Sequence, residues 1–496
     1  MKKVLFLIAT FVALPLSFVK AQGLSMDICP MPQKMNLSEQ NYVPYAQVTI
    51  ACGEKDAEAW ATSHLKEWYA ACAPKVKTAR YKGEPAGAEA YSISIDEKEV
   101  KIQAATLQGV RYALYSLRQI AIPARNTQTV QGWIVPCGTI NDQPDIAFRG
   151  MHISWFIEMA PWEAERLIRL AAYYKLNYVV IEPWGSFKSE VAPWCNWPDA
   201  PLTIDEAHRL TALAKDLGVT LIPQINVFGH ATSSSGGNAK HAVLDFNPQY
   251  QPLFEPDEGW NWCLTNPETR KLLIARMEEM HEAFGNPPYF HIGCDEASAP
   301  SCPNCKARPY GEIVVEHLKA MNEAIAKRGA HTMMWHDMLL QQGDSRWDGF
   351  YANGSEETSS MLKNMPKDIV ICDWYYEGEQ ENYPTLSYFK EQGFPVLSCP
   401  WSNPSGIIAQ GKQVQQLGLE GFLGTLWNTY FGTKLSTIYT NTSNAAWNPD
   451  AASPNMYRTS LFKNHIRQIG WDMHVDDYEK TGWIDYQIEP QTTQYR

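Results

Sequence analysis

Two adjacent acidic residues, Asp295 and Glu296, follow a short apolar run at residues 289–292. Neighbours in a regular strand point to opposite faces, but the backbone leaves the pleat at a strand end, so both carboxylates can reach one cleft. Glycosidases usually place two carboxylates on opposite sides of the scissile bond, on different elements. Adjacent carboxylates cannot span a sugar in this way and suit substrate-assisted cleavage. In that reaction Asp295 would orient the N–H of a 2-acetamido group whose oxygen attacks the anomeric carbon, and Glu296 would protonate the leaving oxygen.

The elements that position this pair alternate along the chain from residue 146 onward. Short apolar runs are separated by helical stretches, and eight such units over some 300 residues predict an α/β fold, a (β/α)8 TIM barrel. A doubly wound sheet is the competing layout, but no Gly-rich phosphate loop follows the first run. The eight predicted strands begin at Phe148, Tyr178, Thr220, Tyr289, His331, Ile369, Val396 and Leu423.

A small α+β domain is predicted before the barrel. Residues 22–145 contain alternating strand patterns and an amphipathic helix at residues 107–120, with a turn expected near residues 141–144. The barrel is assigned to residues 146–446. Residues 447–496 are expected to form a C-terminal helix and tail packed on it.

The first 21 residues have the pattern of a signal peptide. Met1-Lys2-Lys3 precedes an apolar run at residues 4–19 and a small residue, Ala21. The protein is therefore expected to be exported, either periplasmic or secreted. No later stretch is apolar over 18 residues, so no membrane span is predicted.

Composition narrows the class of partner. The net charge of −12 argues against a nucleic-acid partner, because phosphate binding needs a basic surface. The 18 Trp and 24 Tyr supply many aromatic planes, which can stack on the apolar faces of pyranose rings. These features favour a glycan substrate and no cofactor.

The ends of the predicted strands carry polar and aromatic residues, and barrel active sites lie there. Carboxylates, tryptophans and one arginine at these positions indicate a sugar site. The predicted substrate-binding residues are Arg149, His230, Trp335, Asp337, Trp374, Tyr375 and Trp427.

The eleven cysteines are an odd number, so at least one thiol should be free. The motif from Cys302 to Cys305 could be a disulfide, half of a zinc site or a redox pair. A four-ligand zinc site would want a second pair at similar spacing, which is absent, so a local disulfide or a structural clip of the loop is favoured. No HxH or HExxH spacing exists, and no catalytic metal is expected.

The segment from His291 to Glu296 resembles the His-x-Gly-Gly-Asp-Glu signature of glycoside hydrolase family 20, with Cys294 in place of the second glycine. It is especially similar to the hexosaminidase D-like branch. Further matches are Arg149-Gly150-Met151-His152, Phe228-Gly229-His230, Met334-Trp335-His336-Asp337-Met338 and Gly109-Val110-Arg111-Tyr112-Ala113-Leu114.

This resemblance implies an exo-acting, retaining β-N-acetylhexosaminidase that works through an oxazolinium intermediate. Arg149 would hold ring hydroxyls, and His230 would support Glu296. Trp335, Trp374 and Trp427 would wall the pocket, and a tyrosine, for which Tyr375 is the candidate, would bind the acetamide oxygen.

The chain also departs from the family pattern. Ser154 replaces an aspartate, the tyrosine motif of strand seven is missing, and Asn428-Thr429 replaces an acidic position. These departures leave the preference for GlcNAc or GalNAc open. They also keep two alternatives in view: a non-catalytic aminosugar-binding protein on a decayed barrel, and a related substrate-assisted glycosidase family. The sequence does not indicate an oligomeric state.

Overall fold

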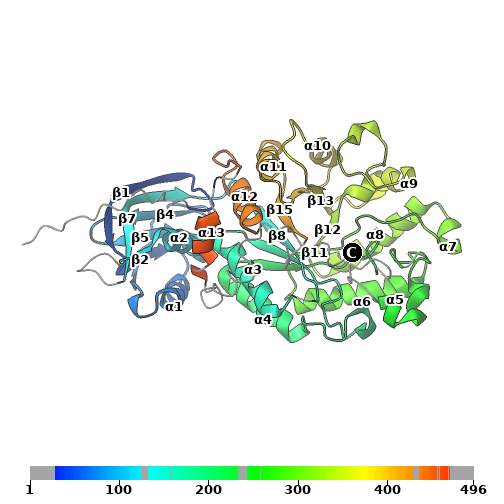
Figure 1. Cartoon of the computed structure of the whole chain (residues 1–496), viewed down its shortest axis with the longest axis horizontal. Helices are drawn as coiled ribbons and strands as arrows, with labels where there is room; N and C mark the ends of the chain where they lie inside the picture. The colour runs from blue at the N-terminus through cyan, green and yellow to red at the C-terminus, as the bar shows by residue number, and fades with distance from the viewer. Residues whose placement is uncertain are drawn as a thin grey trace, which may run out of the picture.

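The structure is a computed structural model (Figure 1). It describes residues 28–124, 132–157, 159–232, 243–256, 259–427, 435–454, 456, 459–466 and 468–469. The predicted signal peptide lies outside the described residues. Within the described ranges, no helix is long and apolar enough to cross a membrane.

The N-terminal part of the chain forms a mixed sheet, drawn in blue and cyan in Figure 1, with strand order β1-β7-β4-β5-β2-β3 and β6 paired to β7. Helices α1 (Ala57–Tyr69) and α2 (Leu107–Ile120) pack on it. The turn predicted near residues 141–144 begins later than expected. Strand β7 runs through Asp142, and its last residues pair with β4. The strands are β1 (Lys34–Pro44), β2 (Gln47–Cys52), β3 (Lys75–Ala79), β4 (Tyr91–Ile95), β5 (Val100–Ala104), β6 (Ile122–Pro123) and β7 (Trp133–Asp142).

The second sheet confirms the predicted barrel. Its order is β10-β9-β8-β15-β14-β13-β12-β11, and neighbouring strands are parallel. A bridge from Gln224 to His291 brings the two ends of this order together, with the Ile225 N–H donating to the His291 carbonyl at 3.0 Å. The strands are β8 (Phe148–Ser154), β9 (Tyr178–Glu182), β10 (Thr220–Pro223), β11 (Tyr289–His291), β12 (His331–Trp335), β13 (Val370–Tyr375), β14 (Val396–Pro400) and β15 (Gly421–Leu426).

Helices surround the barrel. Capping residues and glycines in the local sequence set where these helices begin and end. For example, the Thr203 hydroxyl caps α4 by accepting from the Glu206 N–H, and Gly218 ends it in the left-handed conformation. The longer helices are α3 (Pro161–Tyr173), α4 (Ile204–Leu217), α6 (Pro267–Ala283), α8 (Tyr310–Lys327), α10 (Pro384–Glu391), α11 (Pro404–Leu417), α12 (Leu435–Trp447) and α13 (Thr459–Ile466). The shorter ones are α5 (Val243–Phe246), α7 (Pro303–Lys306) and α9 (Glu356–Ser360).

Alternation along each barrel strand separates an inner core from an outer one. On β13, Cys372 and Trp374 join the cluster that the strands enclose, whereas Ile371 and Tyr375 pack in the outer core with the helices. This parity decides which side chains can reach the mouth of the barrel.

Buried charge pairs join the N-terminal sheet to the amino ends of the barrel strands. The Lys175 ammonium lies 3.0 Å from the Asp142 carboxylate, both with fully buried side chains, and the indole of Trp447 donates to Asp142 at 2.8 Å. In Figure 1, α12 and α13 lie between the sheet and the rest of the barrel. The carboxyl ends of the barrel strands therefore face away from the N-terminal domain.

Candidate active site

A sharp turn after β11 brings the two predicted acids together. Gly293, Cys294 and Glu296 have φ angles of +65°, +80° and +48°, all in the left-handed region. This departure from the pleat cancels the alternation that would otherwise separate Asp295 from Glu296.

Buried neighbours hold this turn in place. The Gly293 N–H donates to Nδ1 of His291 at 3.0 Å, and the Trp335 N–H donates to the Gly293 carbonyl at 2.9 Å. A Cβ on Gly293 would lie 1.8 Å from Oδ1 of Asn226, so only glycine fits. Burial lowers the pKa of His291 well below its usual value, so this ring is neutral and can accept from the backbone.

His230 lies beside both acids. Its Nε2 is 3.2 Å from Oε2 of Glu296 and 3.4 Å from Oδ2 of Asp295. The Asp295 side chain is 12% exposed and that of Glu296 is 50% exposed, so Asp295 forms the floor and Glu296 faces solvent and incoming substrate. His230 itself has a φ of +54°, a second strained residue at the same place.

Asp337 fixes the backbone of Glu296. Its Oδ2 accepts from the Glu296 N–H and from Nδ2 of Asn353, each at 2.9 Å. Asp337 is fully buried. Its burial, and to a lesser degree the negative charge of the nearby Asp295, raises its pKa to about 7. On the other side, the Trp260 indole donates to the Glu296 carbonyl at 2.7 Å. Asp337 was predicted to bind substrate, but this position makes it a positioning residue for Glu296.

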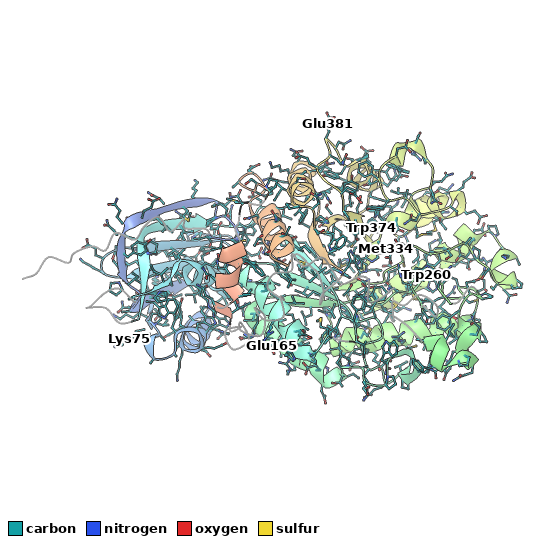
Figure 2. All side chains as sticks on the ribbon, in the orientation of Figure 1. Lys75, Glu165, Trp260, Met334, Trp374 and Glu381 are labelled. Carbon is teal, nitrogen blue, oxygen red and sulfur yellow. The ribbon has the colours of Figure 1, made fainter. Side chains whose placement is uncertain are left out.

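Aromatic rings line the mouth of the barrel. Trp335 lies 4.4 Å from the His291 ring and 5.6 Å from Trp427, measured between centroids. Trp374 stacks on Tyr376 at 5.0 Å, and the Trp427 indole donates to the Tyr376 hydroxyl at 2.7 Å. Figure 2 shows Trp260, Met334 and Trp374 in the barrel, on the side away from the N-terminal sheet. The three predicted tryptophans thus belong to one wall.

The structure does not bring the ring of Tyr375, the predicted acetamide-binding residue, to the aromatic wall, and the reason is the alternation of side chains along β13. Tyr375 packs outward against Phe350 and Tyr383, at centroid distances of 4.9 and 5.4 Å. Tyr376, two residues after Trp374, faces the mouth instead. Burial raises its pKa well above the usual value, and the negative charge of Asp295 adds to this shift. Counting two positions from Trp374 would have identified it from sequence.

Arg149 also lies away from the acids. It is the second residue of β8, fully buried at the amino end of the barrel. Its guanidinium pairs with Glu89 at 2.6 Å and donates to the hydroxyl of Tyr112 at 2.9 Å, both in the N-terminal domain. The predicted contact with sugar hydroxyls is therefore corrected to a structural contact between domains.

A polar group from β8, β9 and the loop after β10 lies beside the aromatic wall. Nε2 of His152 is 2.9 Å from Glu182, whose other oxygen accepts from Nδ2 of Asn226 at 2.9 Å. Glu182, Asn226 and the buried Trp262 line a small pocket together with Trp184 and Gln224. His152 and His336 thus have structural partners, since Nε2 of His336 lies 3.0 Å from the Tyr351 carbonyl oxygen.

Of the two favoured interpretations of Cys302 and Cys305, the disulfide is wrong, because all eleven cysteines are free thiols in the structure. The structural clip of the loop stays a prediction. The replaced acidic position at residues 428–429 lies outside the described residues.

Comparison with known families agrees with this geometry. The model for glycosyl hydrolase family 20, domain 2, matches residues 25–143, and the model for glycosyl hydrolase family 20, catalytic domain, matches residues 189–433. The chain therefore belongs to glycosyl hydrolase family 20, which confirms the resemblance at the level of the family. The hexosaminidase D-like branch stays a prediction.

Curated relatives are distant. A beta-hexosaminidase of Vibrio furnissii is 24% identical over 364 residues, which cover 67% of this chain and 55% of that one. A lacto-N-biosidase of Bifidobacterium bifidum is 22% identical over 312 residues, covering 59% of this chain and 25% of that one. This chain thus spans about half the length of the first relative and a quarter of the second.

Solved structures share the fold. An exo beta-N-acetylglucosaminidase from Vibrio harveyi superposes with a TM-score of 0.66 at 18% identity, covering 89% of this chain and 76% of that one. A beta-N-acetylhexosaminidase from Bacteroides fragilis gives 0.64 at 16% identity, covering 91% and 96%.

Proposed function

We propose that this protein is an exo-acting, retaining β-N-acetylhexosaminidase that uses the 2-acetamido group of its substrate as the nucleophile. The observation that carries the proposal is the turn that places Asp295 and Glu296 side by side, with His230 within 3.4 Å of both. Family membership and the beta-hexosaminidases among its relatives support the same reaction.

Each acid has a distinct task in this mechanism. The buried Asp295 accepts the acetamide N–H, which directs the acetamide oxygen to the anomeric carbon and stabilises the positive charge of the oxazolinium ring that forms. The exposed Glu296 protonates the leaving oxygen and then deprotonates the water that opens the ring. Two displacements at one carbon retain its configuration.

Substrate binding is assigned to the aromatic wall. Trp335, Trp374 and Trp427 would enclose the terminal sugar and its acetamide. The hydroxyl of Tyr376 would donate a hydrogen bond to the acetamide oxygen, which is the role first predicted for Tyr375. The wall supports a terminal N-acetylhexosamine as substrate and leaves the choice between GlcNAc and GalNAc to experiment.

The test compares aryl β-GlcNAc, aryl β-GalNAc and the aryl β-glucoside that lacks the acetamide. The wild type should cleave at least one of the first two and not the third. Asp295→Asn and Glu296→Gln should each lower kcat by about 10²–10⁴-fold. The Glu296→Gln loss should be larger for a sugar leaving group than for nitrophenol, which leaves without much protonation. A folded wild type that binds GlcNAc without cleaving any of the three substrates would instead be an aminosugar-binding protein.

We also propose that the protein is exported, periplasmic or secreted. The support is the charged start and apolar run of residues 1–21. Cell fractionation and the N-terminal sequence of the mature protein test this, and a cytosolic protein that keeps residues 1–21 would contradict it.

A further inference from the structure

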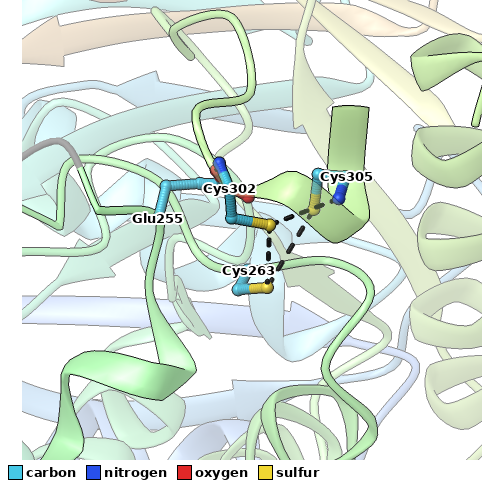
Figure 3. A group of neighbouring side chains, drawn as sticks. All are labelled: Glu255, Cys263, Cys302 and Cys305. Atoms are coloured by element: carbon cyan, nitrogen blue, oxygen red, sulfur yellow. Dashed lines mark hydrogen bonds between the residues drawn. The ribbon is translucent and has the colours of Figure 1, made fainter. Parts of the chain in front are cut away.

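Three sulfurs and one carboxylate converge at one place in the barrel domain (Figure 3). They come from Glu255, Cys263, Cys302 and Cys305, and their potential ligand atoms all lie within 4.8 Å of one another. All four residues are buried, the most exposed at 8%. They are here called the Cys3Glu cluster.

The spacing of the sulfurs distinguishes a metal site from a disulfide. Sγ of Cys263 lies 3.8 Å from Sγ of Cys302 and 4.0 Å from Sγ of Cys305. A tetrahedral zinc ion with Zn–S bonds of about 2.3 Å requires its sulfurs to be about 3.8 Å apart. A disulfide bond needs an S–S distance of about 2.05 Å, and it would include only two of the three sulfurs.

The carboxylate of Glu255 is held with one oxygen available. Its Oε2 accepts from the backbone N–H groups of Ser301 and Cys302 at 2.7 and 2.6 Å. Its Oε1 is buried and accepts no hydrogen bond from an N–H or hydroxyl group among the residues that the structure describes, so only the thiols of Cys302 and Cys305 are left to interact with it. A thiol is a weak donor, so this buried carboxylate oxygen is poorly satisfied, and a cation would satisfy it.

Polar groups lie within hydrogen-bonding distance of two of the three sulfurs. The Cys305 N–H donates to Sγ of Cys302 at 3.2 Å, and the hydroxyl of Thr265 lies 3.3 Å from Sγ of Cys305. Such donors around the sulfurs are what metal sites use to orient and stabilise their ligands.

We propose that the Cys3Glu cluster binds one structural Zn²⁺ ion. Three soft thiolates and a carboxylate, all within 4.8 Å of one another, form a closed four-ligand set, which is typical of structural rather than catalytic zinc. Binding displaces the thiol protons, so the affinity should fall as pH falls.

The ion would cross-link the two loops that hold the acid. Cys302 follows Glu296 by six residues, and Cys263 follows Trp260, whose indole binds the Glu296 carbonyl. Asn261 already joins these loops by accepting from the Ser298 N–H and donating to the Ser298 carbonyl, at 3.0 and 2.8 Å. The site is independent of the proposed reaction, since a non-catalytic protein would need the same loop support.

Zinc content of the purified full chain tests the proposal. After reconstitution with Zn²⁺ under reducing conditions and dialysis, the wild type should retain about one ion per chain. Cys263→Ser, Cys302→Ser and Cys305→Ser should each lose it, and Cys137→Ser, a cysteine of β7 in the N-terminal domain, should keep it. Chelation should lower the Tm of the wild type and leave that of Cys263→Ser unchanged.

Two further measurements keep the test decisive if a serine variant fails to fold. Co²⁺ bound to the wild type should show the thiolate-to-cobalt charge-transfer band, and Glu255→Gln should weaken Zn²⁺ binding at least tenfold. A reduced wild type that retains no zinc would overturn the proposal, as would a native protein with two fewer titratable thiols, which indicates a disulfide. Zinc that persists in the cysteine variants but is lost in His230→Ala would place the ion at the other group of close ligands, His230, Asp295 and Glu296.

Discussion

At the scale of single residues, Tyr376 lies on the same side as Trp374 because side chains alternate along β13 and just beyond it. Its hydroxyl therefore belongs to the site. Its partners are Trp427, which donates to it, and Trp374, on which it stacks. Tyr376→Phe should lower kcat on an aryl β-N-acetylhexosaminide by about 10²-fold, because it removes one donor to the developing oxazolinium. Tyr375→Phe is the matched control, since its ring packs in the outer core. Steady-state kinetics check both, and equal losses would contradict the assignment.

Asp373 should make stability depend on pH. Burial raises its folded-state pKa from 3.8 to about 7. Between these values the folded protein holds a proton that the unfolded chain has released, so the free energy of unfolding falls as pH rises from about 4 to 7. Each pKa unit corresponds to about 1.4 kcal/mol, which sets a ceiling of about 4 kcal/mol.

Asp373→Asn should remove this dependence. Relative to the wild type, the variant should gain stability from about pH 4 to pH 7 and no further above pH 7, as measured by denaturant unfolding. Asp205→Asn, at an exposed position in α4, serves as the control and should run parallel to the wild type. A pH profile of Asp373→Asn parallel to that of the wild type would mean that the carboxyl is ionised in the fold.

At the scale of elements, the turn after β10 presses directly on the turn after β11. A Cβ on Gly229 would lie 2.3 Å from the Asp295 carbonyl oxygen and 3.0 Å from the Ala297 backbone. Gly229→Ala should therefore displace the acids and lower kcat/KM at least about tenfold, because small misplacements at a reacting centre are costly. Gly378→Ala, whose Cβ meets only ordinary contacts beyond 3.5 Å, should be neutral. Circular dichroism verifies that both variants fold.

The elements themselves could be predicted well from sequence, and their contacts less so. All eight barrel strands follow from apolar runs, because parallel strands buried on both faces leave that local signature. The Cys3Glu cluster leaves none: Cys263 stands 39 residues before Cys302, and only the folded loops bring them together. Arg149 was misplaced because the family resemblance outweighed its position: the predicted strand begins at Phe148, which already puts Arg149 at the amino end of the barrel.

At the scale of the whole molecule, the two domains share buried charges. Asp142→Asn leaves the Lys175 ammonium buried without its counter-charge, which should cost about 3 kcal/mol or more in denaturant unfolding. Adding Lys175→Met removes the stranded charge and should recover much of that loss. Activity at low temperature should persist in both variants, because the acids lie at the other end of the barrel. A loss below about 1 kcal/mol for the single variant would argue that water reaches Lys175.

The left-handed backbone at Glu296 has a consequence for how this protein can change. A residue with a β-carbon at φ +48° carries strain of about 1–2 kcal/mol, which glycine would avoid. In most places glycine is less stable than alanine by about 0.5–1 kcal/mol. Here the order should invert, with Glu296→Gly melting above Glu296→Ala in thermal unfolding. Activity and stability therefore oppose each other at this position, and a descendant released from selection for catalysis would gain stability by losing its acid.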